Sequence, residues 1–354
     1  DTGVLSLMTT FANRYVGISR EATYGSLTSI GTEKMGEVDD ESIVHAFDIL
    51  DRGDVSYWGM TKSQNGKEYS EGDLNLVLQA DDFCGLLLYG AMGTDAISGS
   101  DPYTHVMTET VANTLPSFRI RVGRQDLMHT YQGMCVNRLS LSASLGEYVT
   151  MSVGFMGKAE SGLAALIGSP AFDGKSVDGM HFVDASVKFD EDATASTMVK
   201  SFSMELNNNL DGDAACAIGS NTYVRQPPMQ RREVTGTIEF NQPILNSDPL
   251  PAGQESEPTY AELIASGGLE VKPAAAADDY ALRFTLSDGT HTTQLDLFDV
   301  RYEAPSGVNV SGRDTTTMSL NYRAYVRIMG ANPSNHMLEV THMTASANQV
   351  YTGM

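Results

Sequence analysis

Strict alternation of apolar and polar side chains is the feature that most constrains the fold of this chain. Runs such as Phe118–Val122 (FRIRV) and Leu139–Ser142 (LSLS) place every second side chain on the same face of a strand. Only two segments have a helical pattern, Asp81–Tyr89 (DDFCGLLLY) and Tyr260–Ala265 (YAELIA). The sequence therefore predicts a mainly β, antiparallel protein in which two short helices flank the sheets.

The same elements recur in the same order in the two halves of the chain. In the first half, EGDLNL leads to the first predicted helix and then to SFRIRV. In the second half, TGTIEF leads to the second helix and then to ALRFTL. Gly72 and Ser117 are 45 positions apart, and so are Gly236 and Ala281. We interpret this spacing as an internal duplication, with chance matching of alternating strands as the alternative.

A duplication divides the chain into two tandem antiparallel β-sandwich or barrel units, each with one short helix. The stretch between the units is rich in Gly, Ala and Ser and lacks strong alternation, which is typical of a linker. The predicted parts are an N-terminal arm at 1–30, a first unit at 31–158, a linker at 159–180, a second unit at 181–330 and a C-terminal arm at 331–354.

The charge balance bears on the partners of the chain. Forty-five acidic and 23 basic residues give a net charge of −22, which argues against tight binding to a phosphate backbone. Solubility alone, or adaptation to a saline habitat, would also account for this charge. The longest apolar stretch, Phe83–Met92, is about half the length that a bilayer span needs, so no membrane partner is predicted.

Motifs for catalysis, cofactors or metals are missing from the pattern. The odd number of widely spaced cysteines, Cys84, Cys135 and Cys216, predicts small buried side chains. The stretch that starts at Asn207 begins like a calcium loop, but Ile218 stands where the loop needs a bidentate Glu. We therefore predict no catalytic, cofactor-binding or metal-binding residues. A pair of carboxylates across a cleft, as in a glycosidase, stays open.

Several short phrases resemble those of one viral family. Tyr15–Gly25 (YVGISREATYG) resembles the opening of many phage tail tube proteins, where I-x-x-E-x-x-Y-G precedes the first strand. Later phrases keep the order of that family: LPSFRI, YQGMCVN, RLSL, FVDASV, VKSFS, NNNL and REVTG. This ordered run covers roughly residues 13–240. The chain is thus similar to the major tail tube protein of siphovirus-type phages, whose tails are long and flexible.

The resemblance implies a non-enzymatic structural protein of the virion, made in the host cytoplasm. Its subunits would form stacked rings whose inner sheets make a continuous channel for viral DNA, which passes without tight binding. Rings of single-unit subunits in this family are six-fold, so a duplicated chain would form pseudo-six-fold trimers. The partners would be other copies of the chain and the tail proteins at the tube ends. The net charge predicts a negative channel wall.

The segment from Asp51 to Glu71 is the predicted contact between rings. It carries Tyr57, Trp58 and Met60 among Gly, Asn and Lys residues, and such side chains in a polar loop favour an interface. The alternative is that they pack on their own unit.

Two other protein classes share this composition. One is a different virion β-protein, such as a tail-completion or capsid-decorating protein, which would not polymerise by itself. The other is an acidic β-sandwich that binds or hydrolyses glycans, for which Trp58 beside Tyr57 would be the binding platform.

Overall fold

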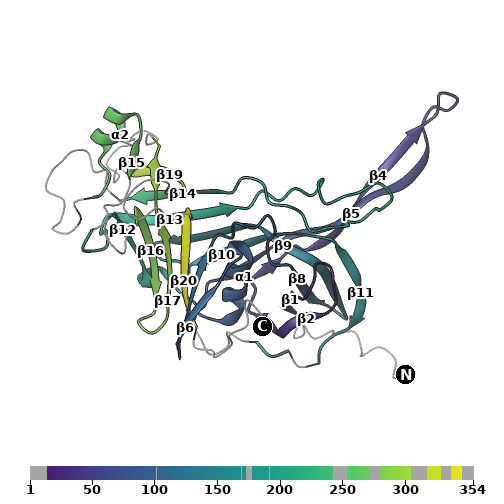
Figure 1. The fold of residues 1–354 in the computed structure, drawn as a ribbon, viewed down its shortest axis with the longest axis horizontal. Coiled ribbons are helices and arrows are strands. Elements are labelled where there is room, and N and C mark those ends of the chain that lie inside the picture. The colour runs from purple at the N-terminus through teal and green to yellow at the C-terminus, as the bar shows by residue number, and fades with distance from the viewer. Residues whose placement is uncertain are drawn as a thin grey trace, which may run out of the picture.

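In the part of the chain that the structure describes, two antiparallel sheets and two α-helices form the folded body (Figure 1). The predicted class is confirmed, because the chain is mainly β. No helix in the part of the chain described here is long and apolar enough to cross a bilayer. The computed structural model describes residues 14–100, 102–168, 170–172, 178–190, 192–241, 254, 256–271, 280–303, 317–327 and 336–344.

The larger sheet has 14 strands and runs through both halves of the chain. Its main path is β15-β18-β19-β14-β13-β9-β10-β5-β3, β4 pairs with β5, and the long strand β9 also pairs with β8 and β11. Strand β1 pairs with β8 and β2. The bounds are β1 (Tyr15–Glu21), β2 (Ser29–Gly36), β3 (Asp40–Glu41), β4 (Val44–Gly53), β5 (Met60–Val77), β8 (Phe118–Arg124), β9 (Leu127–Ser144), β10 (Thr150–Gly157), β11 (Ala159–Ala165), β13 (Val199–Asn207), β14 (Glu233–Phe240), β15 (Leu269–Val271), β18 (Val300–Tyr302) and β19 (Met318–Ala324).

The smaller sheet has six strands in the order β12-β16-β17-β20-β7-β6. Strands β6 and β7 come from the first half of the chain, so both sheets contain strands from both halves. The bounds are β6 (Ala96–Gly99), β7 (Tyr103–Thr108), β12 (Ala185–Phe189), β16 (Leu282–Ser287), β17 (Thr292–Leu297) and β20 (Leu338–Thr344).

The two halves pair their strands by one scheme. The order β1-β8-β9-β11 in the first half has its counterpart in β12-β16-β17-β20, and β5-β10-β9 has its counterpart in β14-β19-β18. The register repeats as well: Ile120 faces Tyr131, and Phe284 faces Leu295. Each residue of the second pair lies 164 positions after its counterpart in the first. The single long strand β9 thus occupies in the first half the positions that β17 and β18 occupy in the second.

Helix α1 (Asp82–Met92) is the centre of the core and not a flanking element. Asp81 caps it by accepting a hydrogen bond from the Cys84 amide at 2.8 Å, and all 11 residues are buried. The helix contacts β9 and β2 of the larger sheet and β20 and β7 of the smaller sheet. Its sequence is apolar around the whole circumference, which is why no face is left for solvent. Helix α2 (Tyr260–Ser266) is close to its predicted range, with Thr259 and Glu262 forming a capping box.

Strands lie within the stretches that the sequence predicts as terminal arms and linker. Strand β1 lies in the predicted N-terminal arm, yet six of its seven residues are buried. Strand β11 lies in the predicted linker and pairs with β9, and β20 lies in the predicted C-terminal arm and pairs with β17 and β7. The mostly exposed strand β11 lacks apolar alternation, so the pattern did not reveal it. The outer parts of the arms, 1–13 and 345–354, lie outside the described residues.

A fully buried histidine joins the smaller sheet to the start of α1. The His342 ring shares a hydrogen bond of 2.8 Å with the Thr293 hydroxyl, and its Nε2 lies 3.2 Å from the Asp81 carbonyl oxygen. His105 is its cross-strand partner and is itself paired with the buried Asp95 at 3.0 Å. Burial lowers the pKa of His342 to about 4.

This depressed pKa makes folding stability depend on pH. His342 is neutral in both states above its usual pKa of 6.5, but below that pH the unfolded chain takes up a proton first. The free energy of unfolding should therefore fall as the pH drops from 6.5 towards 4, by about 3 kcal/mol from this residue alone.

Urea unfolding of the wild type and His342→Asn across this pH range would test the effect. The slopes must be compared between variants, because burial raises the pKa of Glu21 and Glu109 and so acts in the opposite direction. Replacing the more exposed His181 by Asn is the control. Parallel pH profiles for wild type and His342→Asn would contradict the prediction.

Candidate assembly surfaces

A β-hairpin made of β4 and β5 extends far beyond the folded body (Figure 1). We call its outer part, residues 48–65, the arm. The turn at its tip is held by Asp54, whose side chain accepts a hydrogen bond from the Ser56 amide at 2.9 Å. The predicted loop from Asp51 to Glu71 is thus a two-stranded ribbon. Both faces of the ribbon meet solvent, so its sequence shows no alternation of apolar and polar residues.

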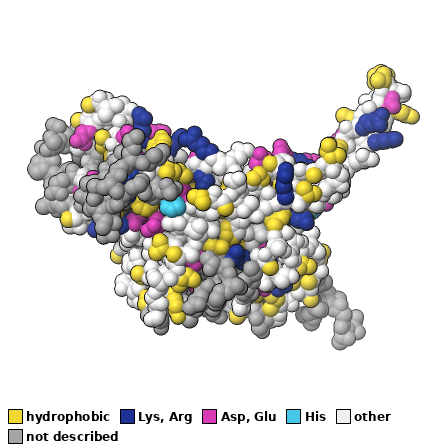
Figure 2. Space-filling view, in the orientation of Figure 1, with side chains coloured by type: hydrophobic (Ala, Val, Ile, Leu, Met, Phe, Trp, Pro, Cys, Tyr) yellow, Lys and Arg dark blue, Asp and Glu magenta, His cyan; other side chains and the backbone are white. Residues whose placement is uncertain are grey.

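The three predicted contact residues lie at the end of the arm and touch no core. Trp58 is fully exposed, and Tyr57 and Met60 are 68% and 72% exposed. The alternative that they pack on their own unit is therefore wrong. Figure 2 shows hydrophobic side chains at the tip of the arm. Sequence reasoning missed the further exposed apolar residues of the hairpin, which are Val44, Phe47, Ile49, Leu50 and Val55.

The base of the arm rests on the segment that connects β13 to β14. The Glu68 amide donates to the Asn221 carbonyl at 2.7 Å, and the rings of Tyr69 and Tyr223 stack with their centroids 6.4 Å apart. Lys67 forms an exposed ion pair with Asp213. Exposed pairs add little stability, so the backbone and ring contacts are what fix the direction of the arm.

One face of the larger sheet is polar in both halves. On β9, β10, β13, β14 and β19 every second residue points away from the core. Among the charged residues near this face, Arg138 pairs with Asp73 at 3.3 Å and Lys200 pairs with Glu239 at 3.5 Å. The uncharged members of the face include Ser140, Ser142, Ser144, Thr150, Ser152, Ser201, Ser203, Asn207, Thr235, Thr237, Ser319 and Asn321. The face is thus rich in hydroxyl groups, and several of its charges are neutralised in pairs.

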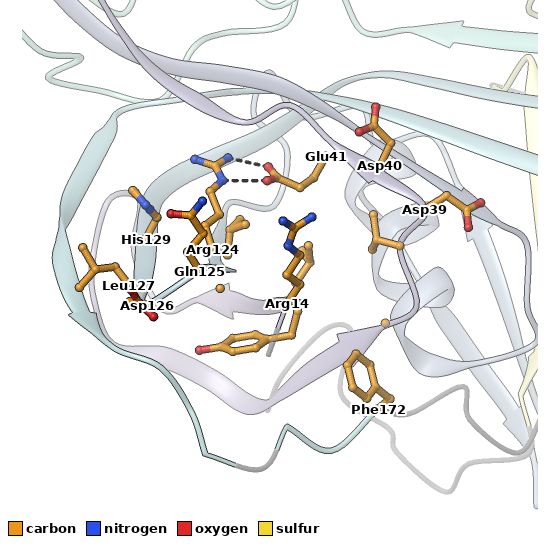
Figure 3. Close-up of a pocket in the computed structure, with 16 residues that line it drawn as sticks. Arg14, Asp39, Asp40, Glu41, Arg124, Gln125, Asp126, Leu127, His129 and Phe172 are labelled. Atoms are coloured by element: carbon orange, nitrogen blue, oxygen red, sulfur yellow. Dashed lines mark hydrogen bonds and ion pairs between the residues drawn. The ribbon is translucent and has the colours of Figure 1, made fainter. Parts of the chain in front are cut away.

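A hollow with a volume of about 660 Å³ lies at the ends of β1, β8 and β9. Figure 3 shows Arg124 reaching Glu41 through two hydrogen bonds, which are 2.7 and 2.6 Å long. Arg124 also donates to the Tyr131 hydroxyl at 3.1 Å. The hydrogen bonds to Glu41 raise the pKa of Arg124, so the Arg124 side chain stays charged and paired with Glu41.

The contents of this hollow do not resemble a catalytic site. Glu41 is occupied by Arg124, and His129 is paired with Glu160 at 2.8 Å. Trp58 lies on the arm and does not line the hollow, so the aromatic platform and the carboxylates of a glycan site are not brought together. Within the described ranges no cluster of three or more His, Cys, Asp or Glu could hold a metal ion. Burial raises the pKa of the Cys135 thiol to about 12, which keeps it unreactive at neutral pH.

Comparison with known proteins identifies the family. No curated protein matches the chain. Residues 12–241 match the family model described as phage tail tube protein, from just before β1 to just after β14. The match covers well over half of the chain and nearly the same range as the ordered phrases of the sequence. The chain therefore belongs to the phage tail tube protein family and is a structural component of a phage tail.

Proposed function

We propose that this chain polymerises into stacked rings that form the tube of a long, flexible phage tail, through which viral DNA passes. The observation that carries the proposal is the single large sheet to which both halves contribute equivalent strands. A sheet of this kind can continue from one copy to the next, because its outer strands have unpaired backbone groups on one side. The role is structural, and it requires no catalytic group.

The junction between the two halves shows how such a sheet could continue. Strand β9 of the first half pairs with β13 of the second, and Leu141 faces Met204. By the shared pairing scheme, the counterpart of β9 is β18, and the counterpart of β13 is the edge formed by β3 and the base of β4. These two strands lie toward opposite ends of the strand order, and the outer side of β18 is paired with the three-residue strand β15, which a second copy would have to extend or replace. A junction of the same kind between two copies would repeat the same rotation and close a ring.

Three chains would then supply six units and complete one pseudo-six-fold ring. The junction within a chain is favoured by its covalent tether, so the junctions between chains should be the weaker and more salt-sensitive ones. The alternative is a ring of six chains in which the second half decorates the outside. The trimer is favoured because both halves share one sheet. If the second half only decorated the outside of the ring, the larger sheet would consist of first-half strands alone.

The polar face of the larger sheet is the surface that we expect to line the channel. Arg138 and Lys200 are paired with carboxylates, and Glu205 and Glu233 on the same face offset the exposed Arg301 and Arg323. The face therefore has no excess of cations, and an excess of cations is what holds a phosphate backbone. Together with the net charge of −22, this predicts a wall along which DNA slides without sticking.

Negative-stain microscopy of the concentrated, purified protein tests the function, and symmetry determination on the tubes tests the arrangement. We expect tubes with three chains per ring, pseudo-six-fold density and the polar face turned inward. Protein that stays monomeric would favour a tail-completion or decoration role. Six chains per ring lined only by first halves, or a wall dominated by Lys and Arg, would overturn the proposed arrangement.

A further inference from the structure

We propose that the arm of one copy docks on a defined patch at the opposite end of the larger sheet of a second copy in the next ring. The patch consists of Leu145, Tyr148 and Val183 with the acidic residues Glu147 and Asp178. This inference rests on the proposed function and names the acceptor that the arm requires.

The patch is a compact surface built from two segments. Leu145, Glu147 and Tyr148 lie in the turn between β9 and β10. Asp178 and Val183 belong to the stretch that ends in the short 3-10 helix η3 (Phe182–Asp184), and a Cβ on Gly179, next to Asp178, would lie 3.7 Å from the Tyr148 ring. The Phe182 amide donates to the Glu147 carbonyl at 3.0 Å, which holds the two segments together. The three apolar side chains are each at least 61% exposed. A cluster of exposed apolar residues with a polar rim is typical of a contact surface.

The position of the patch fits head-to-tail stacking. Strand β10 runs antiparallel to β5, with Thr150 facing Val77 and Gly157 facing Ser70. The turn that carries the patch therefore lies at the end of β5 that is farthest from the arm. From Val77 back to Met60 the strand extends over about 56 Å, at about 3.3 Å per residue. Copies stacked in one orientation would bring the arm of one against the patch of the next, a heterologous contact that can repeat without limit.

The charges of the two surfaces are complementary. Arg52 and Lys62 are direct cross-strand partners on the arm, and like charges in that position destabilise a ribbon. Neither forms an ion pair with another described residue, and both are exposed. Figure 2 shows basic side chains on the arm below its hydrophobic tip. Asp51 points to the other face of the ribbon, because adjacent residues of a strand alternate. The exposed Glu147 and Asp178 would neutralise this pair once the apolar tip reaches the patch.

Charge reversal with rescue is the sharpest test. We expect Arg52→Glu with Lys62→Glu to raise the protein concentration needed for tube formation by roughly tenfold or more. Adding Glu147→Lys and Asp178→Lys to the same chain should restore most of the loss. Leu145→Ser with Val183→Ser should also reduce tubes, whereas Leu163→Ser, a comparably exposed residue on β11, is the matched control.

Cross-linking gives a second readout that does not depend on how much tube forms. In a Cys216→Ser background, chains with Trp58→Cys and Tyr148→Cys should form disulfide-linked ladders between copies when tubes are treated with diamide. Wild-type tubes together with neither rescue nor ladders would overturn the docking site and leave the proposed function standing. Wild-type protein that never forms tubes would overturn both.

Discussion

Deleting residues 55–66 should leave a soluble, folded protein that no longer forms tubes. The deleted residues include the tip of the arm, where Tyr57, Trp58 and Met60 are exposed and contribute nothing to the core. The base of the hairpin keeps its contacts, because Glu68 and Tyr69 still meet the segment between β13 and β14. Circular dichroism and thermal unfolding should match the wild type, and microscopy should show single rings or free subunits.

A milder variant separates the chemistry of the tip from the length of the arm. Replacing Tyr57, Trp58 and Met60 by Ser keeps the ribbon and removes only the apolar groups. Aromatic side chains at the centre of an interface commonly carry most of its binding free energy, so this variant should also fail to form long tubes. Normal polymerisation of the deletion mutant would show that the arm is irrelevant to stacking.

The parts of the fold that sequence could reveal are those in which one face is buried. Strand β9 shows period-two alternation over residues 139–144 because that stretch lies between core and solvent. The helical stretch at α1 was found because it is uniformly apolar. The burial of α1 was not foreseen. A short apolar run fits a flanking helix as well as a buried one, and only the packing of β20 and β7 against it decides.

The parts that sequence could not reveal depend on partners far along the chain. Strand β20 pairs with β7, more than 200 residues earlier, and nothing in its local sequence distinguishes it from the predicted C-terminal arm. At the candidate assembly surfaces, Tyr57, Trp58 and Met60 were predicted from their types alone. The docking patch was not, because its two segments come together only when the Phe182 amide of η3 bonds to Glu147 in the turn after β9.

Two glycines occupy equivalent, crowded positions in the two halves. Gly72 on β5 faces Phe155 of β10, and Gly236 on β14 faces Tyr322 of β19. The Tyr322 hydroxyl donates to the Ser203 carbonyl at 2.9 Å, so the ring lies across Gly236. A Cβ atom on Gly236 would collide with that carbonyl and the ring, and one on Gly72 would come within 2.7 Å of the Ile43 amide nitrogen.

Gly236→Ala should therefore lower the free energy of unfolding by about 3 kcal/mol, the upper end of the range for overpacking. One of the colliding atoms is the Ser203 backbone oxygen, which cannot rotate away as a side chain could. Because Gly236 does not have a positive φ, the loss of stability would come from this collision and not from backbone strain. Gly168→Ala is the matched control, since its Cβ would meet no atom within 4 Å. Gly72→Ala should cost at least as much, because its φ of 148° adds backbone strain.

Chemical denaturation of the wild type and of the three glycine variants tests whether the two halves unfold together. Strand β9 pairs with β13 over seven residue positions, so the sheet should unfold as one unit. Gly72→Ala and Gly236→Ala should then shift the same single transition to lower denaturant, although they lie in different halves. Two separate transitions, each moved by only one of the variants, would mean that the halves fold independently and that the continuous sheet is not what holds the ring subunit together. Wild-type stability of Gly236→Ala would contradict the close approach of Tyr322 to β14.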